Sequence, residues 1–249
     1  MSNLLERTLI IMPAFNEEAS IAAVIAEVHE KLPGAAVLVV NDGSTDRTSA
    51  RARAAGADVL DLPFNLGVGG AMRLGFRYAM IHGYDVAVQI DSDGQHDPAS
   101  VPALLAALEG TDGGPADLVI GARFAGSGEY EARGPRRWAM RLLALTLSRT
   151  AKTKLTDTTS GLKAINRRTI SIFARHYPAE YLGDTIEALV IAARSGRVIR
   201  QVPVTMRKRA GGVPSHNPWK SAVYLGRAVL ALVFALTRPP AVDVPESHA

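Results

Sequence analysis

The sequence predicts an α/β protein whose mostly parallel sheet is flanked by helices. Short apolar segments alternate four times with amphipathic helical segments between residues 8 and 108. This alternation is typical of parallel strands joined by crossover helices. Each apolar segment ends in polar residues. Because the ligands of open α/β sheets bind beyond the carboxyl ends of the strands, we expect the binding site there.

The first strand is expected at residues 8–12 and is expected to stop at Pro13, which has no amide hydrogen to donate. Asn16 is expected to cap a helix that ends near residue 32. Glu17 and Glu18 then lie in its first turn, where the helix dipole favours acids. Further strands are expected at 36–40, 57–62 and 86–90, and further helices at 47–55, from the 65–71 loop to 82, and from the Asp97-Pro98 cap to 108.

The second half of the chain is less regular. The expected elements are a strand at 117–120, a mobile loop at 124–134, a helix at 135–149, a polar turn at 157–162 that enters a short strand, a helix from 181–187 to 195–196, a strand at 198–206, a flexible basic loop at 207–216, an apolar helix at 219–237 and a disordered tail at 239–249.

Composition limits the class of protein. The chain has no cysteine, which excludes disulfides, thiolate zinc sites and cysteine nucleophiles. Its formal charge is +4, and arginine is frequent from Arg123 onward, which favours a basic surface for phosphates or an anionic membrane. Nucleic acid is not an expected partner, because no recognition motif accompanies the charge. The first residues lack a signal pattern, and no apolar run is long enough to predict a transmembrane span.

The acidic turn after the 86–90 strand is the main candidate site. Asp91 and Asp93 alternate along an extended chain and should point the same way. Two carboxylates at the end of a strand form half of a site for a hard divalent cation, which takes its other oxygens from phosphates and water. Gln95 and His96 follow closely enough to complete the site.

Three other interpretations of this turn compete with the metal site. Acidic loop residues are commonly solvated or capping. An EF-hand loop is rejected, because its sixth and twelfth positions hold His96 and Pro102 in place of glycine and glutamate. A phosphatase-type nucleophile would be expected after the first strand.

The glycines of the 65–71 loop do not form a dinucleotide-binding fingerprint, since Met72 stands at the last glycine position. A tight turn that lets a ligand or a helix approach explains them better.

Five motifs occur in order at residues 13–17, 41–46, 65–67, 91–96 and 157–162. Together they resemble the family 2 glycosyltransferases of the Rossmann-like GT-A fold, and within them the dolichol- or polyprenyl-phosphate sugar synthases. The resemblance covers about residues 8–216. It implies an inverting transfer of a sugar from a nucleoside diphosphate sugar to a polyprenyl phosphate, with Mg²⁺ or Mn²⁺ as cofactor.

The resemblance also implies roles for individual residues. The donor substrate is assigned to Pro13, Ala14, Asn16, Glu17, Asp42, Gly67, Asp91 and Ser92, and the metal to Asp91, Asp93 and Gln95. The acceptor phosphate is assigned to Arg123, Arg137 and Ser215, and catalytic roles to Asp93, Asp184 and Arg209. Leu162 and His216 depart from the family pattern, which usually has phenylalanine and lysine there. Asp184 can be a base, an acceptor contact or a helix cap, and we favour the contact.

The implied organisation is a single domain at 1–238, with a nucleotide-sugar half at 8–120, an acceptor half at 121–216 and an amphipathic C-terminal helix at 217–238. The apolar helices with basic stripes fit either core packing or a membrane interface. We expect a cytoplasmic protein attached peripherally to the membrane. Three alternatives stay open, namely a hydroxyl acceptor, a nucleotidyltransferase and a non-catalytic sugar-nucleotide binding module. The base, the sugar and the oligomeric state are not predicted.

Overall fold

A computed structural model describes residues 2–110, 114–123, 145–151, 153–178 and 184–207. Its centre is a seven-stranded sheet in the order β3-β2-β1-β4-β6-β5-β7. The strands are β1 (Thr8–Ala14), β2 (Ala36–Asn41), β3 (Asp58–Asp61), β4 (Val86–Gln89), β5 (Leu118–Ala122), β6 (Lys163–Asn166) and β7 (Ile199–Pro203). The helices are α1 (Ser2–Glu6), α2 (Ile21–Lys31), α3 (Thr48–Ala54), α4 (Gly67–Ile81), the 3₁₀-helix η1 (Pro98–Ser100), α5 (Val101–Glu109), α7 (Arg167–His176) and α8 (Asp184–Arg194). Residues 145–151 are also helical.

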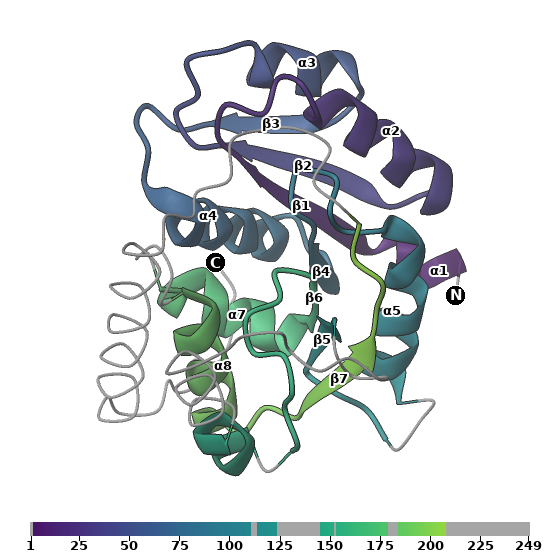
Figure 1. Cartoon of the computed structure of the whole chain (residues 1–249), viewed down its shortest axis with the longest axis vertical. Coiled ribbons are helices and arrows are strands. Elements are labelled where there is room, and N and C mark those ends of the chain that lie inside the picture. The colour runs from purple at the N-terminus through teal and green to yellow at the C-terminus, as the bar shows by residue number, and fades with distance from the viewer. Residues whose placement is uncertain (1, 111–113, 124–144, 152, 179–183, 208–249) are drawn as a thin grey trace.

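Helices cover both faces of the sheet (Figure 1). Strand residues alternate between the two faces, so that Leu9 and Ile11 lie in one buried cluster while Ile10 and Met12 lie in the other. The first cluster also contains residues of α4, α7 and α8, and the second contains residues of α2, α3 and α5. The predicted α/β class and the mostly parallel sheet are therefore confirmed.

Strand β6 breaks the parallel pattern. It is antiparallel to both of its neighbours, β4 and β5, whereas β1, β2, β3 and β4 pair in parallel, as do β5 and β7. The chain therefore enters β6 at the edge of the sheet where the parallel strands end. The polar turn at residues 157–162 is brought to that edge for this reason.

The prediction that Pro13 stops the first strand is wrong. β1 continues to Ala14, and Pro13 is paired with Val40 of β2. The carbonyl groups of Ile11 and Pro13 both face β4, since they accept hydrogen bonds from Ile90 N and Ser92 Oγ. The nitrogen of Pro13 faces β4 as well, because the nitrogen and carbonyl of a strand residue point to the same side. The pairing of β1 with β4 ends at Ile11, so the missing amide hydrogen of Pro13 costs no hydrogen bond between strands.

The prediction that Asn16 caps the next helix is also wrong, because α2 begins at Ile21. Asn16 has a φ of 55°, in the left-handed region that asparagine tolerates. Its amide donates to Ser44 Oγ at 2.9 Å, and its Oδ1 accepts a hydrogen bond from Thr45 N at 2.9 Å. Tertiary hydrogen bonds therefore hold this segment out of the helix.

Helix α7 was not predicted. Asn166 caps it by accepting a hydrogen bond from Thr169 N at 3.0 Å. Its apolar face packs on α4 through Phe76, Phe173 and Tyr177, whose ring centroids lie 5.1–5.3 Å apart. The helix has only ten residues and carries arginines at both ends, so its apolar positions are too few to form a clear helical pattern in the sequence.

Several predicted segments lie outside the described residues. They are the 124–134 loop, most of the 135–149 helix, residues 208–216 of the basic loop, the 219–237 helix and the 239–249 tail. Among the helices that are described, each is too short or too polar to span a bilayer.

Candidate functional site

Four polar segments meet at one edge of the sheet. The carboxyl ends of β1, β2 and β4 lie there because these strands are parallel. The amino end of β6 lies there too, since Lys163 is paired with Gln89 at the end of β4. The segments are residues 15–20, 41–48, 91–97 and 157–161.

The carboxylate of Asp42 holds the loop that follows β3. Its two oxygens accept hydrogen bonds from Leu66 N at 2.7 Å and Gly67 N at 2.9 Å. Burial raises the pKa of Asp42, and these two hydrogen bonds oppose that rise. Gly43 allows the loop to approach, because a Cβ there would lie 2.8 Å from the carbonyl carbon of Phe64. Asp42 and Gly67, which were both assigned to the donor substrate, are thus in contact, while the contact of Asp42 with a base or ribose stays a prediction.

The loop at residues 41–48 also holds the loop at residues 15–20 in place. Glu17 N donates to Thr48 Oγ1 at 2.8 Å, and Glu18 N donates to Asp46 Oδ2 at 3.1 Å. The carbonyl of Ala14 accepts a hydrogen bond from the backbone amide of Asp42 at 2.8 Å. The predicted donor-site residues of β1 and its loop are therefore held against the loop that carries Asp42.

The acidic turn at residues 91–97 is held from within. Asp91 N donates to Nδ1 of the buried His96 at 3.0 Å, and Asp93 Oδ1 accepts a hydrogen bond from Gln95 N at 3.0 Å. Ser92 Oγ donates to the carbonyl of Pro13 at 3.1 Å, which ties the turn to β1. The chain turns at residues 92–93 and is not extended there, so the strand alternation ends at Asp91. The common direction of the two carboxylates stays a prediction.

Gly161 lies against the Asp91 carboxylate. A Cβ at this position would lie 2.8 Å from Asp91 Oδ2 and 3.1 Å from His96 Cε1. Only glycine fits at this position, because the Asp91 carboxylate, which is 39% exposed, packs directly against it. No group of three His, Cys, Asp or Glu side chains that could hold a metal occurs within the described ranges. Two carboxylates and the Gln95 amide nonetheless fit Mg²⁺ or Mn²⁺, which completes its shell with phosphate and water oxygens.

Arg123 is held by the turn that precedes β6. Its Nε lies 2.8 Å from Asp157 Oδ2, and its Nη2 donates to Asp157 Oδ1 at 3.1 Å and Thr159 Oγ1 at 2.8 Å. Burial opposes ionisation of Asp157, but the hydrogen bonds and charge of Arg123 outweigh it and lower the pKa of Asp157. The ion pair with Asp157 thus fixes the orientation of the Arg123 guanidinium, which is assigned to the acceptor phosphate.

Other predicted residues are not placed. Arg137, Arg209 and Ser215 lie outside the described ranges, and Asp184 begins α8 with a side chain that is not described. Conversely, Asp157 and Gly161 of the 157–162 motif are not among the site residues assigned from the sequence. The signal that could have shown their importance is the run of polar residues directly before an apolar strand.

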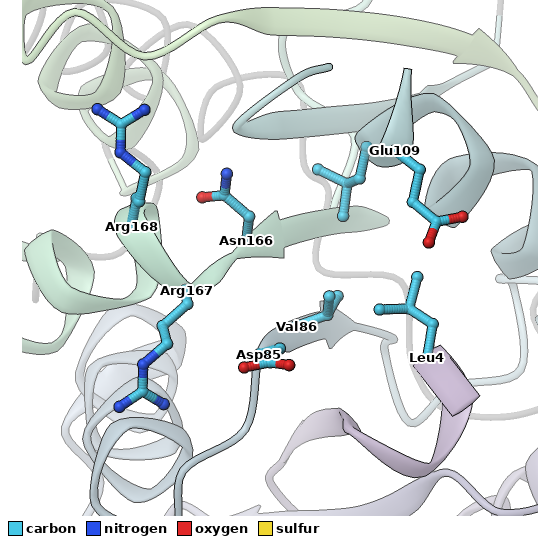
Figure 2. Close-up of a pocket in the computed structure, with 8 residues that line it drawn as sticks. Leu4, Asp85, Val86, Glu109, Asn166, Arg167 and Arg168 are labelled. Atoms are coloured by element: carbon cyan, nitrogen blue, oxygen red, sulfur yellow. The ribbon is translucent and has the colours of Figure 1, made fainter. Parts of the chain in front are cut away.

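A cavity of about 270 Å³ lies at the opposite edge of the sheet, beside the start of β4 (Figure 2). Leu4, Val86 and Leu108 contribute apolar side chains to it. Arg167 and Arg168 flank it but point in opposite directions, so they do not converge on one ligand (Figure 2). This cavity is separate from the four polar segments.

The mixed sheet, with an acidic turn beyond β4 and carboxylate-anchored loops beside it, defines a glycosyltransferase of the GT-A fold. Residues 9–173 match the model of glycosyl transferase family 2, and the chain belongs to this family. The predicted family resemblance and fold are both confirmed.

Two relatives share a polyprenyl-phosphate function in their names. The undecaprenyl-phosphate mannosyltransferase of Micrococcus luteus is 34% identical over 216 residues, covering 83% of this chain and 86% of that protein. The polyprenol monophosphomannose synthase of Mycolicibacterium smegmatis is 33% identical over 223 residues, covering 84% of this chain and 80% of that protein.

A solved structure is similar over almost the whole chain. The glucosyl-3-phosphoglycerate synthase of Mycobacterium tuberculosis, in complex with Mn²⁺, UDP and phosphoglyceric acid, superimposes with a TM-score of 0.70 at 25% identity. The match covers 97% of this chain and 84% of that one.

Asp157→Asn tests the ion pair that fixes Arg123. At pH 7 the free energy of unfolding should fall by about 2 kcal/mol, because a buried partner is lost while the partial exposure of Arg123 limits the effect. The folded-state pKa of Asp157 is lowered, so its stabilisation is present above about pH 4 and is lost as the pH falls through the folded-state value. Urea denaturation at pH 7 and pH 3 should show a smaller difference at pH 3.

Asp85→Asn is the matched control, because half-buried Asp85 forms an ion pair with the exposed Arg7 at the other edge of the sheet. This variant should lose no more than about 0.5 kcal/mol. A difference between wild type and Asp157→Asn that is the same at both pH values would contradict the assignment.

Proposed function

We propose that this glycosyltransferase transfers a sugar from a nucleoside diphosphate sugar to a polyprenyl phosphate, with Mg²⁺ or Mn²⁺. The observation that carries the proposal is the acidic turn at residues 91–97. Its partly exposed Asp91 carboxylate lies against Gly161, and its Ser92 hydroxyl binds the carbonyl of Pro13 in the segment assigned to the nucleoside. The Mn²⁺ and UDP of the similar synthase structure, and the lipid phosphates in the relatives' names, support it.

In this proposal, Asp91, Asp93 and Gln95 hold the cation through oxygen atoms. When bound, the cation offsets the charge that develops on the leaving nucleotide. The backbone bonds of the turn orient its side chains before the substrate arrives, since Asp93 is fixed by the Gln95 amide and Asp91 N by His96. Such prior orientation lowers the cost of reaching the transition state.

Arginine side chains are proposed to bind the phosphate of the acceptor. Arg123 is oriented by Asp157, and a planar guanidinium suits a phosphate. Arg137, Arg209 and Ser215 are assigned to the acceptor from the sequence alone. A phosphate oxygen is already a nucleophile and needs no general base, which is why Asp184 is proposed as an acceptor contact.

Thermal shift tests the donor and the metal together. GDP, UDP and dTDP sugars are compared with and without Mn²⁺, and one base should raise the melting temperature by about 4–8 °C only when Mn²⁺ is present. Asp93→Asn should lose the Mn²⁺-dependent part because it removes a ligand, whereas Asp85→Asn, which lies just before β4 at the opposite edge of the sheet, should keep it. A shift that is equal with and without Mn²⁺ argues against a metal-dependent donor site.

Asp184→Asn tests the nature of the acceptor. With a polyprenyl phosphate acceptor, kcat should stay within about threefold of wild type, because no proton has to be removed from the nucleophile. With a hydroxyl acceptor, the loss of a base should lower kcat by about a hundredfold or more. Steady-state kinetics with both acceptor types decide between them, and turnover of only a hydroxyl acceptor would refute the lipid phosphate.

We also propose peripheral attachment to the cytoplasmic face of the membrane, through the basic stripes predicted on the 135–149 and 219–237 helices. The protein should co-sediment with vesicles that contain anionic lipid, and the bound fraction should fall as salt screens the charges. Protein that stays in the supernatant at low salt contradicts this proposal.

A further inference from the structure

The segment that follows β7 lies along the acidic turn. Met206 forms an isolated antiparallel bridge with His96. The next residue, Arg207, donates its backbone amide to the carbonyl oxygen of Gln95 at 2.9 Å. The backbone of Gln95, whose side chain is assigned to the metal, is therefore fixed from outside its own turn.

The side chain of Arg207 makes a second attachment. Its guanidinium binds both carboxylate oxygens of Glu27 on α2, at 2.7 and 2.8 Å, and it lies 2.8 Å from Asp97 Oδ1. The hydrogen bonds that the guanidinium donates to Glu27 and Asp97 raise the pKa of Arg207, so the group stays charged. Asp97 in turn caps η1 by accepting a hydrogen bond from Ala99 N at 2.9 Å. One guanidinium thus joins α2 to the end of the acidic turn.

We propose that Arg207 is a positioning residue that sets the geometry of the cation-binding turn. Its backbone amide binds the carbonyl of Gln95, and its guanidinium links Asp97 of the turn to Glu27 of α2. The inference rests on the proposed function, because it requires a cation in the turn. Arg207 and Glu27 belong to neither the predicted metal ligands nor the predicted substrate contacts, so they act through the turn.

The solvent exposure of Arg207, Glu27 and Asp97 allows an effect on the metal site to be distinguished from an effect on global stability. The side chains of Arg207, Glu27 and Asp97 are 39%, 26% and 28% exposed. Ion pairs with this exposure contribute little to global stability because solvent screens them. Groups that orient metal ligands nevertheless influence metal affinity strongly when removed. The proposal therefore predicts a change in cation affinity with a small change in melting temperature.

The experiment measures Mn²⁺ binding to the full chain by the electron paramagnetic resonance signal of free Mn²⁺. Arg207→Gln should bind Mn²⁺ about tenfold more weakly, and Arg207→Lys should also bind more weakly because lysine cannot make the bidentate pair. Glu27→Gln should show a smaller loss of about threefold, although Glu27 is not assigned to the metal. Arg7→Gln, which breaks the partly exposed ion pair with Asp85 at the opposite edge, should bind Mn²⁺ like wild type.

Three outcomes would overturn the inference while leaving the proposed cation site intact. Unchanged Mn²⁺ affinity in Arg207→Gln, with a lower melting temperature, would make the residue purely structural. Tighter binding in Arg207→Gln with no change in Arg207→Lys would make the effect one of charge alone, because only the glutamine removes a nearby positive charge. Should Arg207→Gln fail to fold, wild-type affinity in both Arg207→Lys and Glu27→Gln would reject the role. A wild type that binds no Mn²⁺ would instead reject the proposed cation site, and the inference with it.

Discussion

The reversed direction of β6 is the constraint on which the site depends. A parallel strand at this place would put the 157–161 turn at the far edge of the sheet. As an antiparallel neighbour of β4, β6 instead begins beside the acidic turn, where Gly161 meets the Asp91 carboxylate and Asp157 holds Arg123. The residues assigned to the cation and Arg123, which is assigned to the acceptor phosphate, thereby share one edge.

Carboxylates that bind backbone amides hold the loops of this edge in place. Asp42 binds the start of α4, Asp46 binds the segment before α2, and Asp93 binds its own turn. Each bond satisfies an amide that has no partner in a helix or strand, so loops without regular structure keep a defined shape. A site fixed in this way loses little conformational freedom when a diphosphate and a cation bind.

Local patterns predicted the parallel half of the fold and the cap at Asp97, because strand and helix periods and cap residues act over a few positions. They could not predict the direction of β6, since a four-residue strand has the same pattern in either direction. The end of β1 depends on where β4 stops, and the conformation of Asn16 depends on a loop 28 residues away. The pairs Arg123–Asp157 and Arg207–Glu27 are separated by 34 and 180 residues, so no local signal joins them.

The central claim is that the acidic turn holds a cation which in turn holds a diphosphate. The most direct test is the anomalous scattering of Mn²⁺ in a crystal grown with a nucleoside diphosphate. The account predicts one manganese peak, bonded to Asp91, Asp93 and Gln95 on one side and to the diphosphate oxygens on the other, at the end of β4 that faces Gly161. A diphosphate bound with both acidic side chains of the turn directed away from it, or a manganese peak elsewhere, would contradict the account.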